Sequence, residues 1–183
     1  ISTLPLSRRF LELQQSAFLV IGAVVLHYLS NRYDSLVLIN SVDEMRNLGA
    51  RLGATLRKGD IVVLKGTLGA GKTAMTQGIG RSLGITDVTS PTFVIARTHK
   101  AAIPLIHVDA YRLLGNSNQS FEIDDLDLDT AREGAITVIE WGEEVAARLH
   151  EDYLLVSIEF GKHENERVVE LHGHGQRWEG FSL

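Results

Sequence analysis

The eight residues from 66 to 73, GTLGAGKT, limit the possible folds of this chain more than any other segment. They match the pattern G-x-x-x-x-G-K-[ST], whose glycines let main-chain N–H groups close around phosphate oxygens. Residues 61–65 (IVVLK) before the loop form an apolar run of the kind found in a buried strand. A helix is expected directly afterwards, from about Lys72 to Leu83. Strand, glycine-rich loop and helix in this order predict a phosphate-binding loop.

Each part of the loop has an expected role. The main-chain N–H groups and the free N-terminus of the following helix would hold the phosphates of ATP. The Lys72 ammonium would reach the β- and γ-phosphates, and the Thr73 hydroxyl would hold Mg²⁺. The predicted cofactor-binding positions of the loop are Gly66, Thr67, Leu68, Gly69, Ala70, Gly71, Lys72 and Thr73.

A loop of this kind needs an acidic residue at the end of a neighbouring strand, to bind magnesium or to polarise water. Two residues qualify. Glu140 follows the apolar run 135–139 (AITVI), and Asp109 follows the apolar run 105–108 (LIHV). Spacing alone does not decide between them.

The remaining pattern predicts an α/β fold of the P-loop NTPase type, a three-layer sandwich around a mostly parallel sheet with antiparallel additions. Ser41 followed by Glu44 matches a capping box, and it begins a helix predicted from about Val42 to Arg57. Gly78 and Gly80 lie within the helix after the loop, where close packing would explain them. A short helix is also expected at about 142–149. The predicted strands are 36–39, 61–65, 92–98, 105–108, 136–139, 153–160 and 167–171.

Length and composition favour one domain. The chain has 183 residues and no cysteine, and its net charge of −5 argues against a broad surface that binds nucleic acid by itself. We expect an N-terminal extension at 1–35, a P-loop ATPase domain at 36–172 and a C-terminal tail at 173–183. The apolar run 17–29 is too short for a membrane span, which needs about 20 residues. A cytoplasmic protein without a membrane segment is expected.

Other polar clusters have plainer interpretations. The acidic residues 124–129 begin like a calcium loop, but the glycine and glutamate that such a loop needs are absent, so we interpret them as a solvated turn. His172 and His174 are expected in the surface tail rather than on a metal. His107 lies in an apolar strand, and a packed core position is more plausible for it than a ligand.

Four segments in order carry a family resemblance: LGAGKT at 68–73, VTSPTF at 88–93, HVDAYRL at 107–113 and IEW at 139–141. Together they resemble the bacterial TsaE family (also called YjeE), the ATPase of tRNA threonylcarbamoyladenosine synthesis. The resemblance covers about residues 37–171. It implies that the chain works with the TsaB and TsaD proteins, and meets tRNA only through their complex. The family's ATP cycle is thought to regulate or reset the transferase.

The resemblance also implies roles for single residues. Thr73 and Glu140 correspond to the magnesium ligands, and Asp109, with Lys72, to the catalytic positions. The adenine would lie near Ser41 and Val42, at the entry to the first predicted helix, and near the turn before Arg167. Residues 90–93 would form a switch-like segment, and Trp141 follows the magnesium glutamate as in the family. Thr67 departs from the family, which usually has an acid there.

Two other functions remain open. A small-molecule kinase would need an arginine-rich lid and an acceptor pocket, and neither is evident. A nucleotide-dependent binding switch, with incidental hydrolysis, is the second. For hydrolysis, Arg97 and Arg112 could act on the γ-phosphate, or a partner could supply an arginine.

Overall fold

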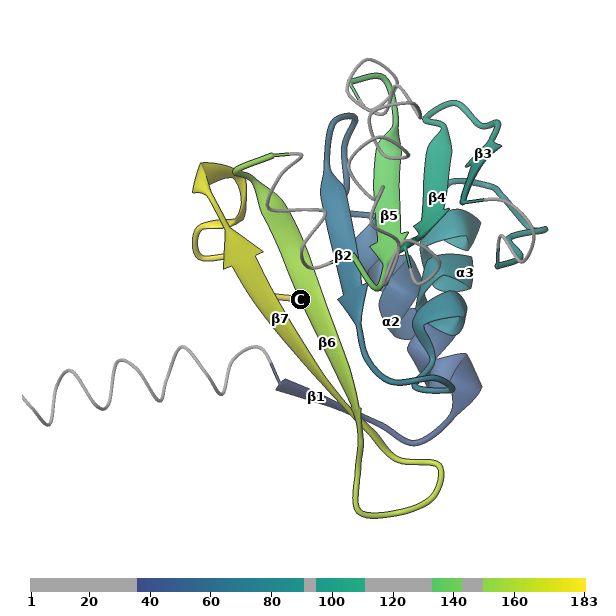
Figure 1. Ribbon diagram of the computed structural model, residues 1–183, viewed down its shortest axis with the longest axis vertical. Coiled ribbons are helices and arrows are strands. Elements are labelled where there is room, and N and C mark those ends of the chain that lie inside the picture. Colours follow the sequence, from purple (N-terminus) through teal and green to yellow (C-terminus); the bar gives the residue numbers. More distant parts are fainter. Residues whose placement is uncertain (1–35, 91–94, 111–132, 143–149) are drawn as a thin grey trace, which may run out of the picture. The chain divides into compact units, whose positions relative to one another are not determined.

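The computed structural model divides the chain into two units, residues 1–35 and 36–183. It describes residues 36–90, 95–110, 133–142 and 150–183, all within the second unit. Their strands form a seven-stranded sheet in the order β1-β7-β6-β2-β5-β4-β3 (Figure 1). The strands are β1 (Leu36–Ile39), β2 (Ile61–Lys65), β3 (Ala96–His99), β4 (Leu105–Asp109), β5 (Ile136–Glu140), β6 (Tyr153–Phe160) and β7 (Arg167–His174). The described helices are α2 (Val42–Gly53), α3 (Lys72–Ser82) and the short 3₁₀ helix η2 (Gln176–Trp178).

The centre of the sheet is parallel and its edges are antiparallel. β2 pairs in parallel with both β5 and β6, and β4 pairs in parallel with β5. β3 runs antiparallel to β4, β7 to β6, and β1 to β7. The predicted mixed α/β fold with antiparallel additions is therefore confirmed. In a parallel centre the strand ends carrying the loop and both acids lie at one edge.

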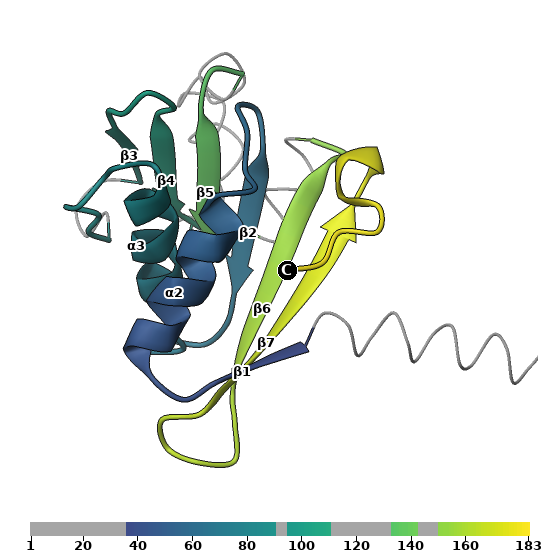
Figure 2. The same cartoon turned by 180° about the vertical axis from the view of Figure 1, so that it is seen from behind.

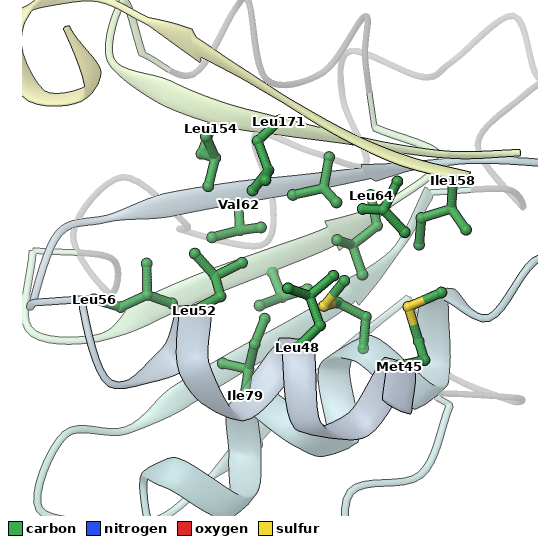
Figure 3. Close-up of a cluster of buried hydrophobic side chains, with 14 of the residues drawn as sticks. Met45, Leu48, Leu52, Leu56, Val62, Leu64, Ile79, Leu154, Ile158 and Leu171 are labelled. Carbon is green, nitrogen blue, oxygen red and sulfur yellow. The ribbon is translucent and has the colours of Figure 1, made fainter. Parts of the chain in front are cut away.

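The strand before the loop is buried on both faces, as its apolar sequence predicts. Val62 and Leu64 pack into the core cluster beneath α2 and α3, and Ile61 and Val63 into a second cluster on the other face. All four side chains are at most 1% exposed. Both helices lie side by side over the first face (Figure 2). Figure 3 shows the apolar stripe of α2 directed at β2 and β6.

Helix α2 begins as predicted but ends earlier. Ser41 Oγ accepts from the Glu44 N–H at 3.1 Å, and the Glu44 carboxylate in turn accepts from the Asn40 N–H at 2.7 Å. The prediction that the helix reaches Arg57 is wrong, because it ends at Gly53. The Asp60 side chain accepts from the Arg57 N–H at 2.9 Å and holds the following residues in a turn that leads into β2.

Glycines bring α2 and α3 into backbone contact. A Cβ added at Gly78 would collide with the carbonyl oxygen of Arg46, and one added at Gly49 with that of Met75. A Cβ at Gly80 would meet the Val88 side chain at 2.5 Å. The prediction that close packing explains Gly78 and Gly80 is confirmed.

Residues after 172 pack against the rest of the sheet, whereas the sequence analysis expected a surface tail there. β7 continues to His174, where the ring stacks on Tyr153 with centroids 4.2 Å apart. Trp178 is only 2% exposed and joins the main core cluster. Arg177 beside it donates twice to the buried Asp60 carboxylate, at 2.9 and 2.8 Å.

Several expectations concern residues outside the described ranges. These are the N-terminal extension with its apolar run, the switch segment apart from Ser90, the acidic residues 124–129, and the helix at 142–149 apart from Gly142. Of the strand expected at 92–98, residues 92–94 also fall there, and within the described residues β3 begins at Ala96. Within the described ranges no helix is long and apolar enough to cross a membrane.

The helix contact predicts an unusual response to Gly78→Ala. In an ordinary helix alanine is favoured over glycine by about 1 kcal/mol. Here the new methyl group would meet the Arg46 carbonyl, so we expect a loss of about 1–3 kcal/mol in the free energy of unfolding, as for an overpacked core. Urea unfolding measures this.

Gly134→Ala is the control, because nothing lies within 4 Å of a Cβ added there. This variant should stay within about 0.5 kcal/mol of the wild type. A Gly78→Ala protein at least as stable as the wild type would contradict the assigned helix contact.

Candidate phosphate-binding site

The glycine-rich loop follows directly from β2 and ends where α3 begins. Position 66 has no room for a side chain, because a Cβ added to Gly66 would meet the carbonyl oxygen of Ile158 on β6. Gly71 has φ 113°, a left-handed value that favours glycine. The loop is thus held close to β6 and turned sharply before the helix. This is the geometry that exposes main-chain N–H groups to a ligand.

The N-terminus of α3 lies at the end of this loop. Its N-cap residue is Gly71, and no side chain makes a capping hydrogen bond there. The first N–H groups of a helix have no carbonyl partner inside the helix, and the helix dipole favours negative charge at this end. The arrangement suits an anion such as a phosphate group.

Lys72 is folded back into the loop. Its Nζ donates to the carbonyl oxygens of Gly66 at 2.7 Å and Thr67 at 3.0 Å, and lies 3.7 Å from the centre of the Trp141 ring. Burial lowers the pKa of Lys72, and the negative charges of Glu140 and Asp109 partly oppose that decrease. Lys72 thus holds a positive charge against the main chain of the loop.

The two candidate acids lie side by side. Asp109 and Glu140 are paired across β4 and β5, at the carboxyl ends of both strands. Glu140 is 4% exposed, and its Oε1 accepts from Thr73 Oγ1 at 3.1 Å. The structure therefore brings one acid to the loop hydroxyl and the other within electrostatic reach of Lys72.

His107 was expected to be a packed core residue, and it is fully buried. Its Nε2 lies 2.9 Å from Glu140 Oε1, so it contacts the site as well. The sequence analysis missed this contact. The alternation along β4 could have indicated it, because residues 107 and 109 share a face of the strand.

A cavity of about 280 Å³ opens beside the loop. Val42 and Arg167, the two positions carried over from the resemblance, both line it. Asn165, in the turn before Arg167, lines it as well, and so do Asn40 and Met45, which the sequence analysis did not select. Asn40 could have been selected from the sequence, because it directly precedes Ser41, the N-cap residue of α2. A cavity of this size suits a small heterocyclic group.

Arg167 ties the turn between β6 and β7 to the loop. Its guanidinium donates to the carbonyl oxygens of Ala70 at 3.2 Å and Gly69 at 3.4 Å. It also donates to those of Glu164 and Glu166, each at 2.9 Å. Arg167 thus fixes the wall of the cavity to the glycine-rich loop.

Trp141 has a strained backbone directly after the acid of β5. Its φ is 62°, and among the described residues no other non-glycine residue has a positive φ. Its N–H donates to the Leu64 carbonyl at 3.1 Å, which turns the chain across the end of β2. The indole consequently lies against Lys72.

The structure describes one of the two arginines that were considered for catalysis. Arg97 on β3 donates to Thr89 Oγ1 at 2.7 Å. Arg112 lies outside the described residues.

Comparisons with known proteins agree on one family. Residues 39–169 match the family model described as threonylcarbamoyl adenosine biosynthesis protein TsaE. The TsaE protein of Streptomyces coelicolor is 49% identical over 141 residues, which are 73% of this chain and 93% of that protein. The TsaE protein of Bacillus subtilis is 33% identical, over 75% of this chain and 84% of its own length.

A solved structure extends the likeness to the fold. The crystal structure of Bacillus subtilis YdiB superimposes with a TM-score of 0.63 at 28% identity. The match covers 79% of this chain and 88% of YdiB.

The lowered pKa of Lys72 predicts how stability depends on pH without ligand. The folded state gives up this proton at a lower pH than the unfolded state, whose lysine has the ordinary value of 10.5. Between these two values the unfolded state binds more protons, so folding becomes more favourable as pH rises. Compared with Lys72→Met, the wild type should therefore gain stability on raising the pH toward 10.5.

Urea unfolding of both proteins at several pH values from 7 to about 10 tests this. Lys58→Met, which removes an exposed lysine, controls for the loss of one positive charge. A difference between wild type and Lys72→Met that is flat or falls with pH would show that burial does not dominate.

Proposed function

This chain belongs to the TsaE family, and on that premise we propose that it is the Mg²⁺-dependent ATPase component of tRNA threonylcarbamoyladenosine biosynthesis. The observation that carries the proposal is the hydrogen bond between Thr73 and Glu140. It joins the hydroxyl at the end of the glycine-rich loop to the acid at the end of β5. A hydroxyl and a carboxylate beside a phosphate-binding loop are the two protein groups that this chemistry requires.

The phosphates of ATP would be held by three groups of this chain. These are the main-chain N–H groups of residues 66–73, the uncapped N-terminus of α3, and the Lys72 ammonium. Binding would replace the carbonyl contacts of Lys72 with contacts to phosphate oxygens, which are stronger because both partners are charged.

The donor set fits magnesium. Mg²⁺ prefers oxygen ligands and is commonly held by one or two protein groups together with substrate phosphates. Thr73 and Glu140 supply a hydroxyl and a carboxylate 3.1 Å apart. When bound, the ion would neutralise charge that develops on the phosphate oxygens during transfer to water.

Hydrolysis would use Asp109. Its position opposite Glu140 puts a second carboxylate at the same sheet edge. There it could orient the water that attacks the γ-phosphorus, with ADP as the leaving group and phosphate released. The base of ATP would occupy the cavity lined by Val42 and Arg167, close enough to the loop for one nucleotide to reach both.

The partners proposed are the TsaB and TsaD proteins, with tRNA met through their complex in the cytoplasm. The support for this is family membership. The net charge of −5 agrees with a protein that does not hold tRNA by itself.

Two substitutions test the nucleotide site by calorimetry. Lys72→Met should weaken ATP binding at least about 100-fold, since it removes charge-assisted hydrogen bonds worth about 1.5–3 kcal/mol each. Glu140→Gln should leave binding without Mg²⁺ intact, and reduce the gain in affinity from Mg²⁺ about 10- to 100-fold. Lys58→Met and Glu159→Gln, at exposed positions, are the matched controls. Unchanged ATP affinity in Lys72→Met would refute the site.

The partner proposal predicts slow turnover by the chain alone and faster turnover with TsaB and TsaD. An arginine supplied by a partner is worth about 10³–10⁵ in rate. Steady-state phosphate release, measured with and without the two proteins, checks this. Equal rates would count against the partners. Asp109→Asn should bind ATP but lose hydrolysis; if the modification of tRNA survives that change, binding alone is what matters.

A further inference from the structure

His107 is a polar residue in a mostly apolar part of the sheet. It lies in the middle of β4 and is 0% exposed. On the same strand, Leu105 packs into the main core cluster. A leucine or valine at position 107 would be easier to bury than an imidazole, which must keep hydrogen-bond partners. Its presence therefore calls for a specific contact.

That contact is with the acid of the site. His107 Nε2 lies 2.9 Å from Glu140 Oε1, and Thr73 Oγ1 lies 3.1 Å from the same oxygen. Glu140 Oε2 has a longer contact of 3.5 Å, again with Thr73. One carboxylate oxygen is thus contacted by side chains from both β4 and α3, whereas the other has the longer contact with Thr73. The orientation of the carboxylate is fixed from two sides.

The direction of this hydrogen bond follows from the other ring nitrogen. His107 Nδ1 is buried, and no residue in the described part of the chain accepts or donates a hydrogen bond there. An N–H at Nδ1 would be a buried donor without an acceptor, which costs about 1–3 kcal/mol, whereas an unpaired acceptor is tolerated more often. Nε2 therefore carries the hydrogen and donates it to Glu140.

We propose that His107 is a positioning residue that orients the Glu140 carboxylate for a divalent cation bound with the nucleotide. The proposal rests on the function proposed above and adds a residue to it. Fixing a glutamate side chain in advance removes rotamer freedom that binding would otherwise have to restrict. Hydrogen-bonded partners of metal ligands typically change metal affinity 10- to 100-fold when they are replaced.

The test compares two variants of similar shape. His107→Gln keeps an amide N–H that can reach Glu140, whereas His107→Met is also unbranched but has no donor. Calorimetry with ADP, in Mg²⁺ and in EDTA, gives the gain in affinity that Mg²⁺ provides. We expect that gain to fall about 10- to 100-fold in the Met variant and to stay within about threefold of the wild type in the Gln variant. ADP affinity in EDTA should be unchanged in both.

Thr137→Val is the control for a substitution in the core of the sheet. Thr137 is 2% exposed on β5, and its hydroxyl has no partner among the described residues. This variant should keep the wild-type gain. If His107→Met does not fold, His107→Asn replaces it, because its amide is one bond too short to reach Glu140 and should give the same loss.

The outcomes separate the two proposals. A Met or Asn variant with the wild-type gain overturns the role of His107, as does a Gln variant that loses as much as the others. A loss of ADP affinity in EDTA would show a general disturbance of the site and would also overturn it. Failure of the wild type to bind ADP at all would instead refute the proposed function.

Discussion

The hydrogen bond between the Thr73 hydroxyl and the Glu140 carboxylate spans 67 residues of sequence and joins the start of α3 to the carboxyl end of β5. It can form because β2 and β5 pair directly, so the loop after one strand begins beside the acid that closes the other. On the other side of β5, β4 places Asp109 opposite Glu140, and the negative charges of both acids act on Lys72. All of these groups lie within residues 39–169, the part of the chain that matches the TsaE family model.

The parts of the fold that local chemistry determines could be predicted. The strand Ile61–Lys65 is apolar along its whole length, the loop has its glycines in a recognisable pattern, and Ser41 with Glu44 marks the start of α2. The end of α2 at Gly53 could not be predicted, because the apolar spacing continues to Leu56, which is buried beyond the end of the helix. The burial of Trp178 was also missed, since a single tryptophan among polar residues gives no periodic signal, and its partners come from distant segments.

The candidate site likewise contains residues that the sequence could predict and residues that it could not. Glu140 and Asp109 could be selected as acids after apolar runs; the register of β4 against β5 sets them side by side, and the contact with Thr73 distinguishes Glu140. The contact of His107 with Glu140 follows from that register too. The cavity could be anticipated only in part, because its walls come from three separate segments: the start of α2, the loop, and the turn between β6 and β7. Arg167 was expected to touch the ligand, and its guanidinium also donates to four carbonyl groups.

The glycine contact between α2 and α3 has a mechanical consequence. Side chains in an ordinary helix interface can change rotamer and absorb a small displacement, whereas main chain against main chain leaves nothing to adjust. The two helices therefore form one stiff body whose N-terminal ends carry different halves of the site, the loop on α3 and Val42 on α2. A shift of one helix should therefore move the other as well, and with it the half of the site that the other helix carries.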